Sequence, residues 1–331
     1  MGHSDGVTKP GKNTKLKDYF QLTKPSLNIM VVFSSVICYL LAPKVVEYDW
    51  FMILLLFVGG YLVTGSANAI NQTIEKDTDA VMKRTASRPI AAGRMQQAEG
   101  WAFAVVTGII GVAILWHFFN GLSAGLAAFS LFLYAFIYTP LKKVNAIAVL
   151  VGAFPGALPC LIGWAAGNDA IFENGHGWQD YGGWVLFAIQ FLWQFPHFWA
   201  IAWIAHKDYS GAGFKLLPAD KGPTKFTALQ TVIYALLLVP VCILPFVINL
   251  TSLSGTRGII CLAIVLLANV FLTGQCVRLY NEMTAKAARR VMFSSYIYLP
   301  IVLLALLADK APPGVTAAVE HAASVLVRFI V

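Results

Sequence analysis

The chain has 331 residues, of which 58% are hydrophobic and only 12% are charged, and its formal net charge at pH 7 is +8. An ordinary soluble domain carries about twice that charged fraction, and the apolar residues lie in blocks of about 17–25, the length that a helix needs to cross a bilayer. These features exclude a soluble enzyme, and the continuously apolar blocks exclude a β-barrel, whose strands alternate apolar and polar residues.

Nine apolar blocks follow one another along the chain and predict nine transmembrane helices, because a helix satisfies its own backbone polar groups inside lipid. The predicted spans are 26–42, 51–70, 101–119, 121–139, 146–165, 184–205, 226–249, 257–279 and 291–308. A very tight turn joins the third span to the fourth. We therefore expect an all-α polytopic membrane protein, with about nine helices in one bundle that forms a transmembrane domain over residues 26–308.

Twenty of the 24 Lys and Arg residues fall in the N-terminal segment and in the loops after even-numbered spans. The positive-inside rule assigns these segments to the cytosol, so the net charge reports topology and no nucleic-acid partner is expected. Residues 1–25 are then a cytosolic tail, with neither the apolar core of a signal peptide nor the Arg residues of a mitochondrial transit peptide. We expect a multi-pass protein of the cell inner (cytoplasmic) membrane. Residues 309–331 are expected as an outer-face tail, in which 315–331 form an amphipathic surface helix or a packed or disordered end.

The end of the second span carries a row of polar side chains. Asn68, Asn71, Glu75 and Asp79 are spaced three, four and four residues apart, so on a helix they share one face. Their carboxylate and carboxamide oxygens are ligands that suit Mg²⁺. An ordinary solvated helix end is the alternative, but polar groups in or beside a span are usually functional. The pattern favours a magnesium site at the cytosolic face, formed by Asn71, Glu75 and Asp79.

Basic residues follow at the same cytosolic level. Arg84 and Arg88 come soon after the acidic residues, and guanidinium groups bind phosphate through paired hydrogen bonds. Tyr138, Lys142 and Lys143 lie at the cytosolic end of the fourth span. Topology-marking charge or lipid headgroup contact is the alternative for each of them. The combination of acids and bases in one short loop favours an anion-binding role for the two arginines.

A second polar group lies in and after the sixth span. His197 is inside the span, Trp203 follows it, and Lys207, Asp208 and Tyr209 lie at the water boundary. On one continuous helix, His197 and Asp208 would share a face. A histidine inside a span is a ligand, a proton carrier or a packed residue, and the sequence leaves these alternatives open.

Together these motifs resemble those of the UbiA-type intramembrane prenyltransferase superfamily and, within it, of the branch that farnesylates heme. The similar segments are Leu22-Thr23-Lys24-Pro25, Asn71-xxx-Glu75-xxx-Asp79, Lys83-Arg84-Thr85-xx-Arg88-Pro89, Tyr138-Thr139-xx-Lys142-Lys143, Phe195-Pro196-His197-Phe198-Trp199 and Lys207-Asp208-Tyr209. Two positions depart from the superfamily pattern. Glu75 replaces the usual aspartate, and Ile204 stands where quinone-type members have a further aspartate, as the resemblance to the heme branch implies.

The resemblance implies that a farnesyl group passes from farnesyl diphosphate to the vinyl group of heme B, with addition of water, to give heme O and diphosphate. It implies Mg²⁺ as cofactor, with the metal ligands Asn71, Glu75, Asp79 and Asp208. The implied catalytic residues are Asn68, Asn71, Glu75, Asp79, Arg84, Arg88, Lys142 and Asp208. The implied substrate-binding residues are Arg84, Arg88, Tyr138, Lys142, Lys143, His197, Trp203, Lys207 and Tyr209. His197 then either ligates the heme iron or relays a proton.

Two other functions stay open. A polyprenyltransferase that acts on an aromatic quinone precursor would use the same acidic and basic cluster. A transporter would use intramembrane polar residues as a substrate path, although transporters tend to have broken helices near the midplane. The expected partners are heme B, farnesyl diphosphate and the lipid bilayer, with a heme A synthesis or oxidase assembly protein as a further partner.

Overall fold

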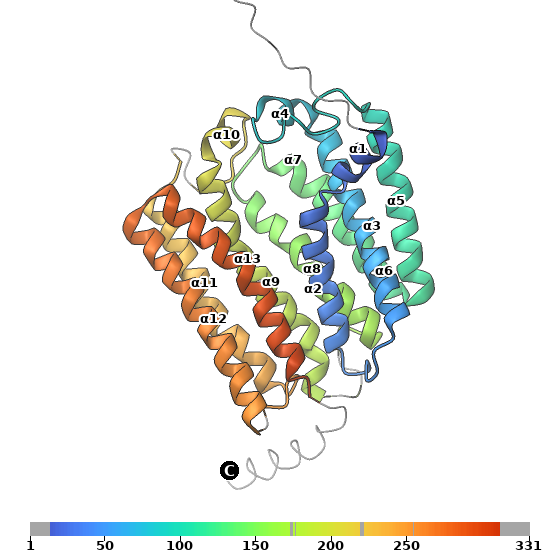
Figure 1. The fold of residues 1–331 in the computed structure, drawn as a ribbon, viewed down its shortest axis with the longest axis vertical. Coiled ribbons are helices and arrows are strands. Elements are labelled where there is room, and N and C mark those ends of the chain that lie inside the picture. Colours follow the sequence, from blue (N-terminus) through green and yellow to red (C-terminus); the bar gives the residue numbers. More distant parts are fainter. Residues whose placement is uncertain (1–13, 173–174, 176, 219–221, 254, 312–331) are drawn as a thin grey trace, which may run out of the picture.

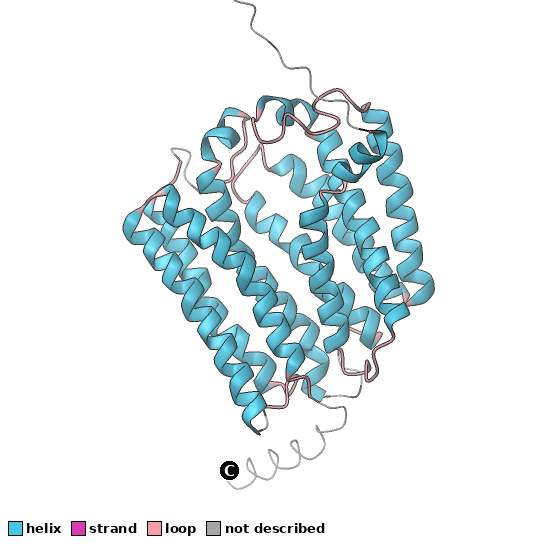
Figure 2. Cartoon of the chain, viewed as in Figure 1, coloured by secondary structure: helices cyan, strands magenta, loops and turns pink. Residues whose placement is uncertain are grey.

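The computed structural model of the chain describes residues 14–172, 175, 177–218, 222–253 and 255–311. Over these ranges the protein is a single bundle of helices (Figure 1, Figure 2), and the only pairing of extended segments in them is an isolated bridge between Thr251 and Lys310. The prediction of an all-α protein is confirmed.

The long helices run up and down the bundle, and the short ones connect them. The long helices are α2 (Pro25–Leu41), α3 (Trp50–Ile74), α5 (Gln97–Phe118), α6 (Gly121–Phe132), α8 (Ala148–Asn168), α9 (Gly182–Ile204), α11 (Lys225–Val247), α12 (Gly255–Glu282) and α13 (Ala285–Ala308). The short helices are α1 (Lys15–Leu22), α4 (Lys76–Val81), α7 (Thr139–Leu141) and α10 (His206–Gly211), with a π-helix η1 (Leu133–Tyr138) and a 3₁₀-helix η2 (Gly177–Tyr181).

Eight of the described helical segments are long and apolar enough to cross a membrane, and a ninth results if α1 and α2, which meet at 47°, count as one bent span. The fourth predicted span corresponds to one continuous helical segment, Gly121–Leu141, in which η1 links α6 to α7. The prediction of about nine spans is confirmed, and each predicted span overlaps one long helix.

Local sequence signals explain where several of these helices begin. The side chain of Asp49 accepts from the N–H groups of the first turn of α3, and Asn120 does the same for α6. Thr224 and Thr284 cap α11 and α13 in the same way. Each cap satisfies at least one of the N–H groups that a helix start leaves without a partner, so the helix boundaries follow from single polar residues between apolar blocks.

Glycines allow neighbouring helices to touch along their backbones. A Cβ atom at Gly111 of α5 would come within 2.8 Å of the carbonyl oxygen of Gly59 on α3. A Cβ at Gly163 of α8 would come within 1.8 Å of the carbonyl oxygen of Ser35 on α2. Small residues at helix contacts are typical of membrane bundles, and here they hold α3 against α5 and α2 against α8.

The short helices α1, α4, α7 and α10 gather at one end of the bundle, the upper end in Figure 1, which we call the α4 end. The predicted N-terminal tail includes α1. Its Asp18 is buried and accepts hydrogen bonds from Arg94 at 2.9 and 3.0 Å. The predictions for residues 315–331 lie outside the described residues.

His197 and Asp208 do not lie on one continuous helix. Helix α9 ends at Ile204 and α10 begins at His206, because Ala205 between them has φ −95° and ψ 14°. The N–H of Ala205 still donates to the carbonyl oxygen of Ile201, and the N–H of Tyr209 donates to that of Ala205, both at 2.9 Å. The helical spacing is thus kept through the break, and a shared face of His197 and Asp208 stays a prediction.

Candidate active site

A break between α3 and α4 at Glu75 organises the site. Glu75 has φ −90° and ψ 14°, which ends α3 and begins α4. Its N–H still donates to the carbonyl oxygen of Asn71 at 3.0 Å, and the N–H of Asp79 donates to that of Glu75 at 2.7 Å. The four-residue spacing is therefore kept through the break. The residues Asn71, Glu75 and Asp79 are 1%, 4% and 1% exposed, so their side chains lie inside the protein.

Each of these three polar side chains has a cation as its partner. Arg88 Nη1 donates to both carboxylate oxygens of Asp79, at 2.7 and 2.6 Å. The ammonium of Lys142 pairs with Glu75, and Lys24 Nζ donates to Asn71 Oδ1 at 2.6 Å. We call these six residues the charge cluster. Buried charges are stable only when they are paired. Each carboxylate of the cluster is paired with a cation, and the cluster has one more formal positive charge than negative.

Lys24 lies in the bend between α1 and α2 and belongs to the charge cluster. In the sequence, only its place in the Leu22-Thr23-Lys24-Pro25 motif indicated a functional role. Its φ of 49° is the left-handed conformation, which is uncommon for residues other than glycine. The carbonyl oxygen of the preceding Thr23 accepts from Asn68 Nδ2 at 3.0 Å. Backbone strain of this kind is frequent at functional sites. Asn68 therefore anchors the segment that delivers Lys24.

Burial makes the two lysines of the cluster costly to charge. It lowers the pKa of Lys24 well below its ordinary value, and the nearby Arg88 and Lys142 lower it further. Burial also lowers the pKa of Lys142, while Glu75 acts in the opposite direction. An additional anion next to these ammonium groups would stabilise their charged forms, so the electrostatics favour an anionic ligand.

Arg84 and Tyr209 extend the site toward α10. Arg84 Nη2 donates to the hydroxyl oxygen of Tyr209 at 3.0 Å, and the guanidinium carbon lies 5.5 Å from the centre of that ring. The Tyr209 ring meets Phe214 edge to face at 5.8 Å. Lys142 Nζ lies 5.3 Å from the ring centre of Phe214 and 5.0 Å from that of Tyr138. Cation–π contacts attract these cations without neutralising them, so their charge still acts on an anion.

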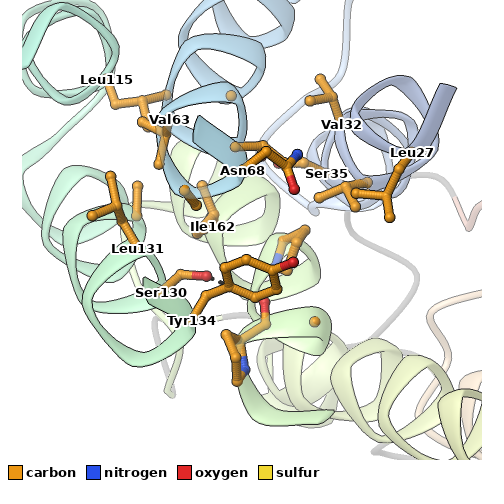
Figure 3. Close-up of a pocket in the computed structure, with 18 residues that line it drawn as sticks. Leu27, Val32, Ser35, Val63, Asn68, Leu115, Ser130, Leu131, Tyr134 and Ile162 are labelled. Carbon is orange, nitrogen blue, oxygen red and sulfur yellow. Dashed lines mark hydrogen bonds between the residues drawn. The ribbon is translucent and has the colours of Figure 1, made fainter. Parts of the chain in front are cut away.

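A largely apolar cavity adjoins the charge cluster, bounded by α2, α3, α5, α6 and α8 together with η1 (Figure 3). It contains about 660 Å³ of empty space, part of which opens to the outside. Side chains from these helices point toward one another around it, and Asn68 and Tyr134 are among its few polar groups. Asn68 precedes Asn71 by about one turn of α3, so the cavity and the charge cluster meet along one helix.

The π-helix η1 connects the cavity wall to the charge cluster. Thr139 follows η1, and its hydroxyl donates to the carbonyl oxygen of Tyr134 at 2.8 Å. The same hydroxyl oxygen accepts from Asn71 Nδ2 at 3.3 Å, which turns Asn71 Oδ1 toward Lys24. Short π segments are frequent at functional sites, and this one fixes the orientation of a predicted metal ligand.

The profile of the UbiA prenyltransferase family matches residues 31–297. The chain belongs to the UbiA prenyltransferase family. Two similar relatives carry the name protoheme IX farnesyltransferase. The one from Cytophaga hutchinsonii is 43% identical over 297 residues, which cover 90% of this chain and 99% of the relative. The one from Flavobacterium johnsoniae is 40% identical over 300 residues, with 88% and 94% covered.

Solved structures share the UbiA fold. A structure described as digeranylgeranylglyceryl phosphate synthase has a TM-score of 0.70 at 21% identity and covers 89% of this chain and 98% of its own. A UbiA homolog from Archaeoglobus fulgidus bound to GPP and Mg²⁺ has a TM-score of 0.62 at 13% identity, with 87% and 99% covered. These neighbours confirm the predicted membrane-bundle architecture.

The structure brings together most, but not all, of the residues that the UbiA resemblance implied. Lys143 and Lys207 are exposed. Asp208 is partly buried, and no hydrogen bond or ion pair of its side chain occurs among the described residues. Trp203 packs in the main hydrophobic core. No group of three His, Cys, Asp or Glu side chains in the described ranges is arranged to hold a metal. The predicted roles of Asn71, Glu75, Asp79 and Asp208 as metal ligands therefore stay predictions.

His197 of this UbiA family member belongs to α9, and its side chain packs against α13. Its Nδ1 forms a hydrogen bond with the hydroxyl of Ser295 at 2.8 Å. Its ring stacks on Trp193, with centres 5.0 Å apart, and meets Tyr296 edge to face at 4.8 Å. The residue is not part of the lining of the cavity. Its predicted roles as heme ligand or proton relay stay predictions.

Proposed function

We propose that this protein transfers a farnesyl group from farnesyl diphosphate to the vinyl group of heme B, with addition of water, to give heme O and diphosphate. Similar proteins named protoheme IX farnesyltransferase, which align over nearly their whole length, support the identity of both substrates. They favour this reaction over prenylation of an aromatic quinone precursor and over transport.

The observation that carries the proposal is the contact between a buried charge cluster and a largely apolar cavity. Such a site suits a molecule with a strongly anionic head and an apolar tail, which is the chemistry of a prenyl diphosphate. Lys24, Arg88 and Lys142 attract the head, while the cavity takes the tail out of water.

The donor chemistry of the cluster fits Mg²⁺, which takes oxygen ligands and keeps other positions for water and phosphate oxygens. Asn71, Glu75 and Asp79 are the proposed ligands, with Asp208 as a further one. When bound, the ion supplies positive charge beside the leaving diphosphate. The Archaeoglobus fulgidus homolog, bound to GPP and Mg²⁺, supports this assignment.

The protein's own cations assist the bond-breaking step. The allylic C–O bond of farnesyl diphosphate breaks and its electron pair leaves with the diphosphate. Farnesyl C1 then bonds to the terminal vinyl carbon, and water adds to the adjacent carbon with loss of a proton. Lys24, Arg88 and Lys142 stabilise the developing negative charge from inside the site, and Arg84 does so from its rim. The exposed Lys143 and Lys207 add attraction at longer range.

On the heme side, Tyr138 and Tyr209 are proposed to contact the macrocycle near the diphosphate. Trp203 and His197 are proposed to act from α9, with His197 as an iron ligand or a proton relay. These roles rest on the resemblance to the heme branch, and a heme absorbance titration of His197→Ala tests the role of His197.

The α4 end is proposed to face the cytosol, with the N-terminal tail 1–25 on the same side and the tail 309–331 on the opposite side of the cell inner membrane. The distribution of Lys and Arg supports this orientation. A protein of heme A synthesis or oxidase assembly is the proposed recipient of heme O.

The deciding experiment incubates the purified protein with heme B, farnesyl diphosphate and Mg²⁺ and measures the mass of the porphyrin product. The expected product is heavier than heme B by one farnesyl group plus one hydroxyl group. A parallel incubation replaces heme B by an aromatic quinone precursor. Prenylation of that precursor, with heme B unchanged, would contradict the proposal.

A further inference from the structure

The cavity has an upper end near the charge cluster and a lower end deep in the bundle. On α3, which rises toward the cluster, Asn68 lines the upper end and Gly60 the lower one. Ile162, well along α8 as it descends from the α4 end, also lines the lower end, where Leu115 of α5 joins it. Figure 3 labels Leu115, Val63 and Ile162 among the residues that line the cavity.

Tight helix contacts lie at the level of this lower end. Gly59, next to Gly60, lies so close to α5 that a Cβ there would come within 3.3 Å of Leu115, and a Cβ at Gly111 would meet the Gly59 carbonyl oxygen at 2.8 Å. On the other side, Gly163 follows Ile162 directly and lies against the Ser35 carbonyl oxygen. Leu115 itself is completely buried. Backbone contacts of this kind do not separate easily, so the cavity has a rigid floor.

The distance from the charge cluster to this floor matches one chain length. Asn71 and Gly60 are eleven residues apart on α3, which is about 16 Å at the rise of an α-helix. The main chain of three isoprene units, which has twelve carbon atoms, has a similar length when extended. A two-unit tail would leave the floor uncovered, whereas a four-unit tail would meet Leu115 and the backbone behind it.

We infer that the floor formed by Gly60, Leu115 and Ile162 limits the prenyl tail to three isoprene units and so selects farnesyl over geranylgeranyl diphosphate. This inference rests on the proposed function, since it takes the cavity as the site of the tail. Selection against the longer tail follows from steric overlap with a closely packed wall. Selection against the shorter tail follows from apolar surface left in contact with water or empty space.

Two substitutions test the floor in opposite directions. A Cβ at Gly60 would lie 3.5 Å from the methyl groups of Val32, an ordinary contact, so Gly60→Leu fits at its base and extends into the cavity. It is expected to weaken farnesyl diphosphate binding by at least about tenfold, while geranyl diphosphate binding changes by less than about threefold. Leu115→Ala deepens the cavity, and geranylgeranyl diphosphate binding is expected to improve by about tenfold.

The control is Gly125→Leu, which makes the same change on the exposed side of α6, where no atom lies within 4 Å of a Cβ. Binding of the three diphosphates is measured with Mg²⁺ on the folded, detergent-purified proteins, and transfer to heme B is measured separately. Opposite shifts in chain-length preference for Gly60→Leu and Leu115→Ala, absent from Gly125→Leu, support the inference. An unchanged preference in either folded variant overturns it. Chain-length shifts in binding without any heme product would support the floor and refute the proposed heme reaction.

Discussion

Arg88→Ala tests how strongly the charge cluster depends on its ion pairs. The change removes both hydrogen bonds from the Asp79 carboxylate, which is 1% exposed. Leaving one member of a buried ion pair alone costs about 3–5 kcal/mol. The Arg88 side chain is 21% exposed, so water enters the vacated space and the expected loss is about 3 kcal/mol of unfolding free energy. Adding Asp79→Asn removes the unpaired charge and is expected to restore most of that loss.

Arg84→Ala is the matched comparison, because its hydrogen bond to Tyr209 is exposed and contributes only about 1 kcal/mol. Both single variants are expected to bind farnesyl diphosphate about ten- to a hundredfold more weakly, since each loses a charge-assisted phosphate contact. The assays are unfolding of the purified protein by SDS titration and equilibrium binding of farnesyl diphosphate. Equal stability of the two variants would refute the dependence of Asp79 on Arg88, and unchanged affinity in both would refute the diphosphate assignment.

Glu75→Gln and Asp79→Asn are expected to abolish transfer in a folded, membrane-inserted protein, and Mg²⁺-dependent activity in both would contradict the metal assignment. Because burial lowers the pKa of Lys24, its ammonium loses its proton at a lower pH than an exposed lysine. The KM for farnesyl diphosphate should therefore rise with pH below the ordinary lysine range, and Lys24→Arg should move that rise to higher pH; identical KM profiles would count against this role. His197→Ala is expected to alter the heme absorbance titration and leave diphosphate binding intact, whereas an unchanged heme spectrum and affinity would exclude iron ligation.

The spans were predictable because a transmembrane helix is specified locally. Each apolar block is long enough to form a helix by itself, and single residues such as Asp49 and Asn120 determine where helices begin. The spacing of Asn71, Glu75 and Asp79 was predictable for the same reason, since it depends only on helical periodicity.

The breaks and pairings were less predictable because they depend on contacts between distant segments. Neither Glu75 nor Ala205 has a proline or glycine close by in the sequence that would predict the end of a helix. A solvated helix end was the alternative interpretation for Glu75 and Asp79, but both are buried. Their burial depends on Lys142 and Arg88, which tertiary packing brings to them. The contact of Lys24 with Asn71 was not predicted, because a lysine beside a span usually marks topology. The contact depends on the bend between α1 and α2.

The pairing of Glu75 with Lys142 has a consequence for how the chain assembles in the membrane. Glu75 lies at the end of α3, but its partner Lys142 is synthesised only after α5, α6 and η1. A lone carboxylate is costly to hold away from water, so the α3–α4 junction gains its native burial only once the first half of the bundle has closed around it. We therefore expect the charge cluster to form in the same step of membrane insertion that closes the first half of the bundle. A chain truncated before Lys142 would lack the counter-charge that lets Glu75 stay inside.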